Sequence, residues 1–364
     1  MLILVDSLLF LLGVAVVGSA LTSAVLTLVL PRGTRDFLTL VVFKLTWLLF
    51  LPPTRLAHSY KQRDHVMALY APLTLLLLPV IWLTLVLLGY MMMYWAIGVR
   101  PLAEAFLLSG SSLFTLGFAQ ANSTIELILV FSEAGIGLGL VALLIAYLPS
   151  MYSAFSYREK AVNLLEVRAG SPPSAVEWLL RAQRNEWLED LGEDFAVWES
   201  WFAELEESHT SLSPLVFFRS PQPDRSWITA TGAVLDSAAL MLAAVDVNFD
   251  DRNAKLCLRA GYLALMQIAD LFGIWYNAES RIPDEPISVS REEFYDACNQ
   301  LADGGVPLKE DLEQGWLDFA GWRVNYDRTL VALAALTRAP YAPWSSDRSV
   351  RGMRDKSPGC VRDR

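Results

Sequence analysis

The sequence predicts an all-α membrane protein with three transmembrane helices, a re-entrant loop and an all-helical cytoplasmic domain. The apolar residues of the 364-residue chain are concentrated in its first 150 residues. Those residues carry seven Lys or Arg and six Asp or Glu, so the overall formal charge of −10 leaves −11 for the remainder. In the acidic remainder, apolar residues recur every three or four positions, which is typical of amphipathic helices.

The first apolar stretch, residues 8–30, is long enough to cross a bilayer, since it would extend about 34 Å as a helix. Ser19, Ala20, Ser23 and Ala24 lie in or after the apolar run, as in a cleaved signal peptide. However, no Lys or Arg precedes the stretch, and it is too long for an ordinary signal core. We favour a retained span and keep cleavage as the alternative.

Two further stretches have the length of a span. Residues 68–97 contain Pro72 and Pro79 and end in Tyr and Trp side chains, which favour the headgroup zone. This stretch is longer than one crossing of the membrane requires, and a tilted helix would accommodate the excess length. Residues 125–148 form the third span, and we expect it to end at Pro149.

Basic residues predict the orientation of these spans in the cell membrane. They gather between spans one and two and again after span three, at Arg32, Arg35, Lys44, Arg55, Lys61, Arg63, Arg158, Lys160 and Arg168. Both regions are therefore expected to be cytoplasmic, with the N-terminus outside and the C-terminal domain inside. Residues 37–50 would break this agreement as a fourth span and carry Lys44 in their middle, so we predict an interfacial helix there.

The segment between spans two and three, residues 101–122, reads PLAEAFLLSGSSLFTLGFAQAN. It is too short and polar to span the membrane, yet too apolar for an ordinary loop. We expect a short helix over residues 102–112 followed by an extended strand. Non-helical backbone at membrane depth is tolerated where it lines a water-filled path, so this is a candidate pore loop.

The order span, pore helix, TxGF and span resembles the pore module of potassium channels over residues 68–150. In that family four identical loops surround a dehydrated potassium ion with backbone carbonyls and Thr hydroxyls. The resemblance therefore implies a homotetramer that conducts potassium or other monovalent cations. It places the selectivity filter at Thr115, Leu116, Gly117, Phe118 and Ala119, and its support at Ser109, Ser111, Ser112, Phe114 and Gln120.

The loop departs from the family's Thr-Val-Gly-Tyr-Gly filter in three places. Leu116 and Phe118 are expected to keep apolar side chains behind the filter. Ala119 replaces the second Gly, which would cost on the order of 1 kcal/mol if positive φ were required. Family members often pair a Glu of the pore helix with an Asp after the filter. Ser111 and Gln120 stand at those positions, so we expect a weaker interaction between the pore helix and the segment after the filter than in the family.

Other candidate residues lie beside the filter. Glu104 lies in the first turn of the pore helix, where its carboxylate interacts favourably with the helix dipole and could draw cations to the mouth of the pore. Glu133 lies deep in span three, where we expect a hydrogen bond behind the filter rather than ion binding. Gly135 or Gly139 is a candidate bend of the inner helix. The alternative for these glycines, together with Gly137, is close packing against neighbouring helices.

After Pro149 the chain becomes polar, and Pro172 and Pro173 mark a break. A capping box of Ser174 and Glu177 is expected to open the next helix. Apolar residues then recur at three- and four-residue intervals and form one apolar helix face, made of Trp187, Leu188, Leu191, Phe195, Trp198, Trp201, Phe202 and Leu205. We expect that face to be buried in the domain's own core. Further helices are predicted over residues 227–245, 254–277, 290–302 and 309–337. The first of these is apolar enough to resemble a membrane span, but Asp236 near its centre favours a buried helix of a soluble domain.

The chain is therefore divided into an N-terminal transmembrane helix with an interfacial linker (1–65), a pore module (66–150), a helical cytoplasmic domain (151–344) and a disordered tail (345–364). Its three Cys and three His are scattered, so we predict reduced thiols and no metal site beyond the permeant ion. The acidic domain disfavours nucleic acid as a partner. We expect no cofactor and an unidentified ligand or protein at that domain.

These observations favour a potassium-channel-like pore with a cytoplasmic regulatory or assembly domain. One alternative is a non-conducting, membrane-anchored scaffold or signalling protein with a degenerate pore loop, for which Ala119 is the best support. A membrane-bound enzyme is a third possibility. The chain has no recognised phosphate-loop, hydrolase or metalloprotease motif, so we expect no enzymatic activity and no catalytic residue.

Overall fold

The computed structural model describes residues 2–30, 36–56, 60–278 and 285–348. These residues form helices and no strand, and one isolated antiparallel bridge joins Val245 to Leu308. The predicted all-helical fold is confirmed. The chain divides into two compact units. Unit 1 comprises Met1–His58 and Val66–Ser153, and unit 2 comprises Ser59–His65 and Ala154–Arg364.

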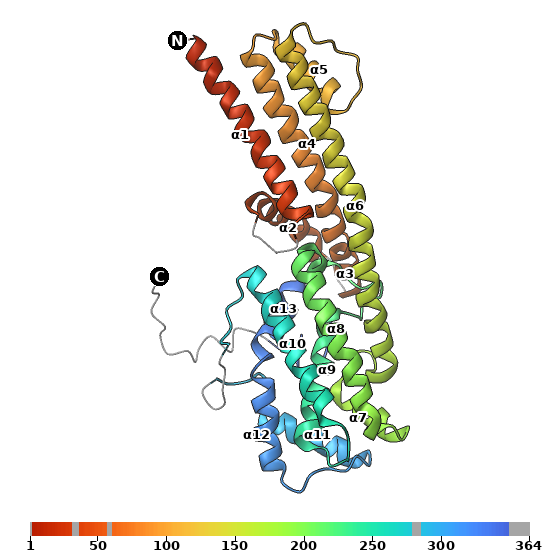
Figure 1. The fold of residues 1–364 in the computed structure, drawn as a ribbon. Coiled ribbons are helices and arrows are strands. Elements are labelled where there is room, and N and C mark those ends of the chain that lie inside the picture. Colours follow the sequence, from red (N-terminus) through yellow and green to blue (C-terminus); the bar gives the residue numbers. More distant parts are fainter. Residues whose placement is uncertain (1, 31–35, 57–59, 279–284, 349–364) are drawn as a thin grey trace. The chain divides into compact units, whose positions relative to one another are not determined.

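Unit 1 is built from apolar helices. They are α1 (Leu2–Leu28), α2 (Phe37–Leu56), α4 (Tyr70–Ala96), α5 (Leu102–Leu113) and the first part of α6 (Thr124–Ala169), while α3 (Tyr60–Ala68) begins in unit 2. Within unit 1, α1 runs beside α4 (Figure 1). Ile3–Leu28, Tyr60–Ala96 and Thr124–Ala169 are long and apolar enough to cross a membrane. The chain is thus a multi-pass membrane protein.

Small residues bring α1 and α4 into close contact. A Cβ added to Gly13 would lie 2.5 Å from the carbonyl oxygen of Gly89, and one added to Gly89 would lie 2.9 Å from that of Gly13. Such glycine contacts let two helices approach closely in lipid. Further along, the indole of Trp82 donates a hydrogen bond of 3.0 Å to the Ser23 hydroxyl. The first predicted span is therefore packed tightly against the second.

The helix predicted at residues 37–50 is present as α2. Three of its rings surround Tyr70 at the start of α4, with centroids 6.0 Å away for Phe43, 5.3 Å for Trp47 and 5.7 Å for Phe50. Edge-on packing of this kind adds to the burial of apolar area. The opposite face of α2, including Phe37 and Leu49, is exposed.

The prediction that the third span ends at Pro149 is wrong. Helix α6 continues through Pro149 to Ala169, leaving unit 1 after Ser153. Proline removes one backbone donor but can be accommodated inside long apolar helices. The continuation is favoured by tertiary packing, because Val162, Leu165 and Ala169 are buried in the core of unit 2.

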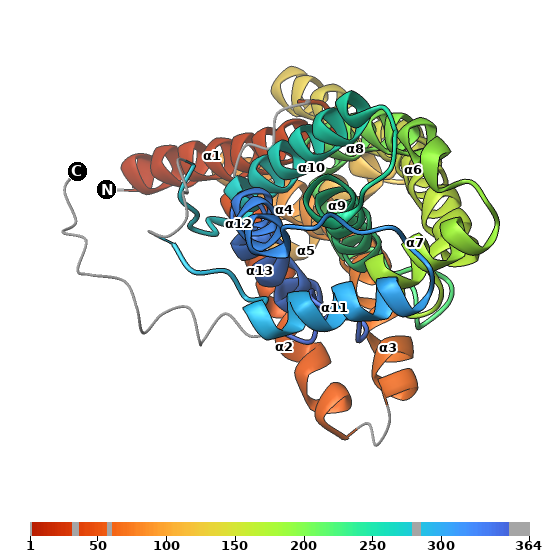
Figure 2. The same ribbon diagram turned by 90° about the horizontal axis from the view of Figure 1, so that it is seen from below.

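Unit 2 is a bundle around a buried central helix, α9. Its elements after α6 are α7 (Ala175–Arg184), α8 (Leu191–Ser211), α9 (Trp227–Ala244), α10 (Asp251–Phe272), α11 (Arg291–Asp303), α12 (Leu312–Arg323) and α13 (Asp327–Thr337), with short 3-10 turns at Leu188–Asp190 and Ser213–Phe217. Helix α9 packs against α7, α10, α12 and α13 and is viewed nearly end-on in Figure 2. It is also apolar enough to span a membrane, but 94% of it is buried within the protein.

The aromatic face predicted for the cytoplasmic domain is buried in the core of unit 2, as expected. Phe195, Trp198, Trp201, Phe202 and Leu205 all belong to it. The helix opened by Ser174 is, however, interrupted before this face: α7 ends at Arg184, and Glu186 has a positive φ of 61°. This turn separates α7 from α8, and both helices contribute buried residues to the same core.

Three local predictions in unit 2 need correction. Ser174 caps α7, but Glu177 binds Arg181 instead of completing a capping box. Helix α10 ends at Phe272 rather than at residue 277, because Gly273 takes a left-handed C-cap. The single helix predicted over residues 309–337 is two helices, α12 and α13. The break between them allows residues from both to meet one buried carboxylate.

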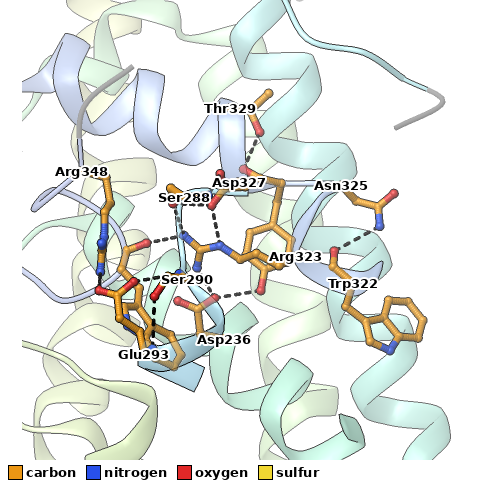
Figure 3. A network of polar contacts seen from close by, with 12 residues as sticks. Asp236, Ser288, Ser290, Glu293, Trp322, Arg323, Asn325, Asp327, Thr329 and Arg348 are labelled. Atoms are coloured by element: carbon orange, nitrogen blue, oxygen red, sulfur yellow. Dashed lines mark hydrogen bonds and ion pairs between the residues drawn. The ribbon is translucent and has the colours of Figure 1, made fainter. Parts of the chain in front are cut away.

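That carboxylate is Asp236, in the centre of α9. The fully buried guanidinium of Arg323 binds Asp236 and, at 2.7 Å, Asp327, and the hydroxyl of Tyr326 donates to Asp236 at 2.8 Å (Figure 3). The third guanidinium nitrogen, Nη2, donates to the carbonyl of Trp344. Buried charges require paired and hydrogen-bonded partners, and this network supplies them.

The ends of unit 2 are also held by arginines. Arg219 binds Asp64 in α3 and donates to the carbonyls of Thr337 and Arg338 at 2.8 and 2.9 Å, which explains why Ser59–His65 belongs to unit 2. The tail predicted to be disordered from residue 345 begins as packed structure, since Ser345 is buried and Arg348 pairs with Glu293. Its remainder, with Cys360, lies outside the described residues.

Cys257 and Cys298 are buried free thiols, as predicted.

The part of α6 in unit 2 carries a buried arginine. Arg158 donates to the carbonyls of Leu215 and Phe218 at 2.9 and 2.7 Å, and its guanidinium lies 3.3 Å from Nε2 of His209. Burial lowers the pKa of His209 well below its ordinary 6.5, and the charge of Arg158 lowers it further. His209 is therefore neutral in the folded protein and accepts from Arg158.

This histidine predicts acid sensitivity. Because the folded pKa is depressed, the unfolded state binds more protons below pH 6.5, and stability falls as the pH drops through that window. We expect a slope of up to about 1.4 kcal/mol per pH unit in the free energy of unfolding. His209→Gln should remove this slope in chemical denaturation followed by Trp fluorescence. His65→Gln, at an exposed site, should retain it; equal slopes in both variants would contradict the assignment.

Candidate functional site

The candidate site is the loop that follows α5. Pro101 precedes this helix, where its missing N–H is not needed, and Glu104 lies exposed in the first turn. One face of α5, including Ala105, Leu108 and Ser109, is buried, and the helix packs against α4. The observed bounds agree closely with the predicted residues 102–112. The segment after α5 is irregular rather than the strand that we expected.

Ser111 holds the loop against the end of α5. Its buried hydroxyl accepts hydrogen bonds from the peptide N–H groups of Phe118 and Ala119, both at 3.1 Å. Its carbonyl accepts from the N–H of Leu116 at 2.8 Å. The partners of Ser111 are thus backbone groups and not Gln120, which is exposed. The weaker interaction expected between Ser111 and Gln120 is absent from the described structure.

These three hydrogen bonds determine where the loop carbonyls point. In a trans peptide the C=O and N–H are antiparallel. The carbonyls of Thr115, Gly117 and Phe118 share peptides with the N–H groups that face Ser111, so they point away from α5. None of the three accepts a hydrogen bond from any described residue. The loop therefore presents three free carbonyl oxygens on the side opposite its supporting helix.

The backbone of the loop alternates in conformation. Thr115 and Gly117 have positive φ values of 51° and 72°, while Leu116 between them does not. Ala119 also lacks positive φ, so the cost considered for Ala in place of the family's second Gly does not arise here. The left-handed position that requires a glycine is that of Gly117.

The apolar side chains of the loop do not lie behind it in this chain. Leu116 and Phe118 are each 61% exposed, and Phe114 is also exposed. The expectation that they pack behind the filter is therefore not met within one chain. Large exposed apolar side chains next to unpaired carbonyls indicate a surface that requires a further partner.

Behind α5, Glu133 of α6 connects three helices. Its carboxylate is fully buried and accepts from the hydroxyls of Ser109 at 2.5 Å and Tyr94 at 3.0 Å. Ser109 also contacts the carbonyl of Leu87 at 3.0 Å. This is the hydrogen bond that we expected of Glu133, and it joins α4, α5 and α6 beneath the loop. Ser112 instead donates to Leu108 of its own helix at 2.7 Å.

Two residues that contribute to the site, Tyr94 and Glu126, were not predicted from the sequence. Tyr94 completes the Glu133 cluster from 39 residues away, and no sequence pattern indicated that contact. Glu126 binds the N–H of Asn122 and the hydroxyl of Ser123 at the start of α6. The S-x-x-E pattern of Ser123 and Glu126 was a recognisable helix-start motif that could have found this contact.

Among the glycines of α6, only Gly137 is in close contact. A Cβ added there would lie 2.2 Å from the carbonyl oxygen of Leu113, at the end of α5. Gly135 and Gly139 have nothing within 4 Å of an added Cβ. Close packing therefore applies to Gly137, and the bend proposed at Gly135 or Gly139 remains a prediction.

Gly137→Ala should force α6 away from α5. Overpacking of this kind typically costs about 1–3 kcal/mol, and the atom met here is backbone, which cannot move aside as a side chain can. We expect a lower melting temperature in detergent for Gly137→Ala than for Gly135→Ala or Gly139→Ala. Equal melting temperatures for the three variants would show that α5 and α6 are not in this contact.

The described residues contain no group of three or more His, Cys, Asp or Glu that could hold a metal ion. The oxygen donors of the site are instead backbone carbonyls and the Thr115 hydroxyl. Comparisons of this chain with protein-family models, curated proteins and solved structures found no match.

Proposed function

We propose that the chain is one subunit of a potassium-channel-like pore that carries potassium or monovalent cations passively across a membrane. The observation that carries the proposal is the set of free carbonyls of Thr115, Gly117 and Phe118, turned away from α5 by Ser111. Carbonyl oxygens in such rows replace the hydration shell of a cation. No covalent chemistry is involved.

One loop offers too few oxygens to surround a cation, so several copies must meet at an axis. The resemblance implies four, and the exposed Leu116 and Phe118 supply apolar surface for contacts between copies. Unpaired carbonyls facing lipid would each cost several kcal/mol, whereas carbonyls facing a water-filled path would not. A homotetramer around a central pore satisfies both requirements.

We place three spans in the bilayer: α1, α4 and the part of α6 in unit 1. Helix α9 is excluded because its apolar surface is covered by unit 2. The distribution of basic residues puts the N-terminus outside and unit 2 in the cytoplasm. Unit 2 then regulates the pore or holds the tetramer together, and the unbroken α6 is its covalent link to the pore module.

The competing proposal is a non-conducting scaffold or signalling protein in which the loop is degenerate. In the sequence, the replacement of the second filter glycine by Ala119 favours it, although Ala119 does not adopt positive φ in the structure. The two proposals differ in the role of the loop backbone. Only a channel makes transport depend on the left-handed conformation of Gly117.

The test is potassium flux into proteoliposomes for Gly117→Ala. A Cβ at φ 72° costs on the order of 1 kcal/mol per subunit and turns the neighbouring carbonyls, so we expect flux to be lost. The matched control is Gly98→Ala, which introduces comparable strain at φ 102° outside the filter and should conduct. Equal flux from both variants, or none from the folded wild-type tetramer, would favour the scaffold.

A further inference from the structure

Unit 2 contains a cavity of about 280 Å³ beside the buried charge network. Its walls come from the start of α7, the centre of α9, one face of α11 and the segment that follows α13. The residues that matter for its chemistry are Asp236, Glu293, Asp296, Gln300 and Trp344. The volume is just below the range of about 300–1,000 Å³ that is usual for drug-sized ligands, so a small ligand fits.

The charge of the cavity wall is one-sided. Among the described residues, three carboxylates line the cavity and no Lys, Arg or His does. Arg323 and Arg348 bind Asp236 and Glu293 without lining the cavity themselves. Asp296 forms no ion pair with any described residue. Because Asp236 and Glu293 are already paired, the uncompensated negative charge at the wall is that of Asp296, and all three carboxylates offer acceptor oxygens.

Asp236 has one oxygen available to a ligand. Both Arg323 and Tyr326 bind its Oδ1, and Oδ2 accepts no hydrogen bond from the described residues (Figure 3). The side chain is only 2% exposed, yet the residue lines the cavity. This oxygen is not one of the buried unpartnered atoms of the described structure, so it is open to the cavity, where a donor group of a ligand can bind it.

An aromatic wall faces the same space. Trp344 has a positive φ of 59°, its carbonyl is bound by Arg323, and its ring packs on Phe319 with centroids 5.6 Å apart. The ring is therefore positioned before any ligand arrives. Aromatic faces attract cations, most strongly when the cation is partly desolvated. Ala175, Val176, Ala297 and Pro343 add apolar surface.

We propose that this cavity binds a small organic cation, an amine or guanidinium with a short apolar body. The ammonium or guanidinium group donates to the oxygens of Asp236 and Asp296 and lies against Trp344, while the apolar part contacts the remaining wall. Among the described residues, the cavity carboxylates do not form a group of the kind that holds a metal ion. This proposal concerns binding by unit 2 and is independent of conduction.

The experiment is isothermal titration of the full-length protein in detergent with butylamine and 2-phenylethylamine. Butanol and 2-phenylethanol serve as neutral isosteres and control for partition into micelles. We expect the amines to bind and the alcohols not to bind. No amine binding to folded protein, or equal binding of the alcohols, would overturn the proposal.

Matched variants on α11 locate the site. Asp296 is exposed and makes no ion pair, so Asp296→Asn should leave the fold intact and weaken amine binding at least tenfold. Asp303 lies at the exposed end of the same helix, outside the cavity. The Asp303→Asn variant should therefore bind the amines with the affinity of the wild type. Equal affinities in the two variants would show that the amines bind elsewhere.

Discussion

Ser111→Ala should reduce the preference for potassium over sodium at least tenfold. The substitution removes the acceptor for the N–H groups of both Phe118 and Ala119, which now lie at 3.1 Å from the Ser111 hydroxyl. Each unsatisfied group costs about 1–3 kcal/mol, so these peptides will turn to find other acceptors. Their carbonyls, which include that of Gly117, turn with them.

The neighbouring serine provides the control. Ser112→Ala removes a hydroxyl that donates to Leu108 of its own helix, so the loop peptides keep their partners and selectivity should persist. Both variants should be compared as tetramers of equal melting temperature, using potassium and sodium flux into liposomes. Unchanged selectivity in Ser111→Ala would mean that this hydroxyl does not orient the carbonyls.

Arg323→Met should lower the free energy of unfolding of unit 2 by about 3–5 kcal/mol at pH 7, because removing one partner leaves buried charges uncompensated. Asp236 and Asp327 both lose their guanidinium partner, and both are nearly fully buried. Burial raises the pKa of Asp236, whereas Arg323 lowers it. Without Arg323 the folded pKa rises further above the unfolded value, so the penalty should shrink as the pH falls from 7 towards 4.

Chemical denaturation followed by Trp fluorescence measures this loss. Arg291→Met is the control, since the pair of Arg291 and Glu313 is largely exposed and should contribute no more than about 1 kcal/mol. The pH dependence of the difference between Arg323→Met and the wild type is the more specific result. A loss that does not change with pH would assign Arg323 a packing role instead of a charge-pairing role.

Local composition was sufficient to predict the helices of unit 1 but not how α6 ends. Continuous apolar runs predict α1 and α4, and Pro101 followed by good helix formers predicts α5. Pro149 looked like an end because its cost is local, whereas the packing of Val162 and Leu165 that favours continuation is tertiary. The same limit explains α12 and α13. The break between them lets Arg323 and Tyr326 bind Asp236, which lies 87 and 90 residues earlier in the chain.

The candidate site was predictable in position and only partly in construction. The TxGF pattern located the loop, and the depth of Glu133 in an apolar span predicted its buried hydrogen bond. The role of Ser111 was not predictable, because a serine that accepts from a backbone seven residues away has no sequence pattern. Tyr94 was missed for the same reason, and Gly137 was separable from Gly135 and Gly139 only by its contact with α5.

The measurement that tests the proposed pore most directly is the reversal potential of the wild-type protein in a planar bilayer, with potassium on one side and sodium on the other. The free carbonyls of Thr115, Gly117 and Phe118 predict a current whose reversal potential is displaced in the direction of potassium selectivity. Folded tetramers that pass no current across voltage and pH would contradict the channel and leave the scaffold as the better account.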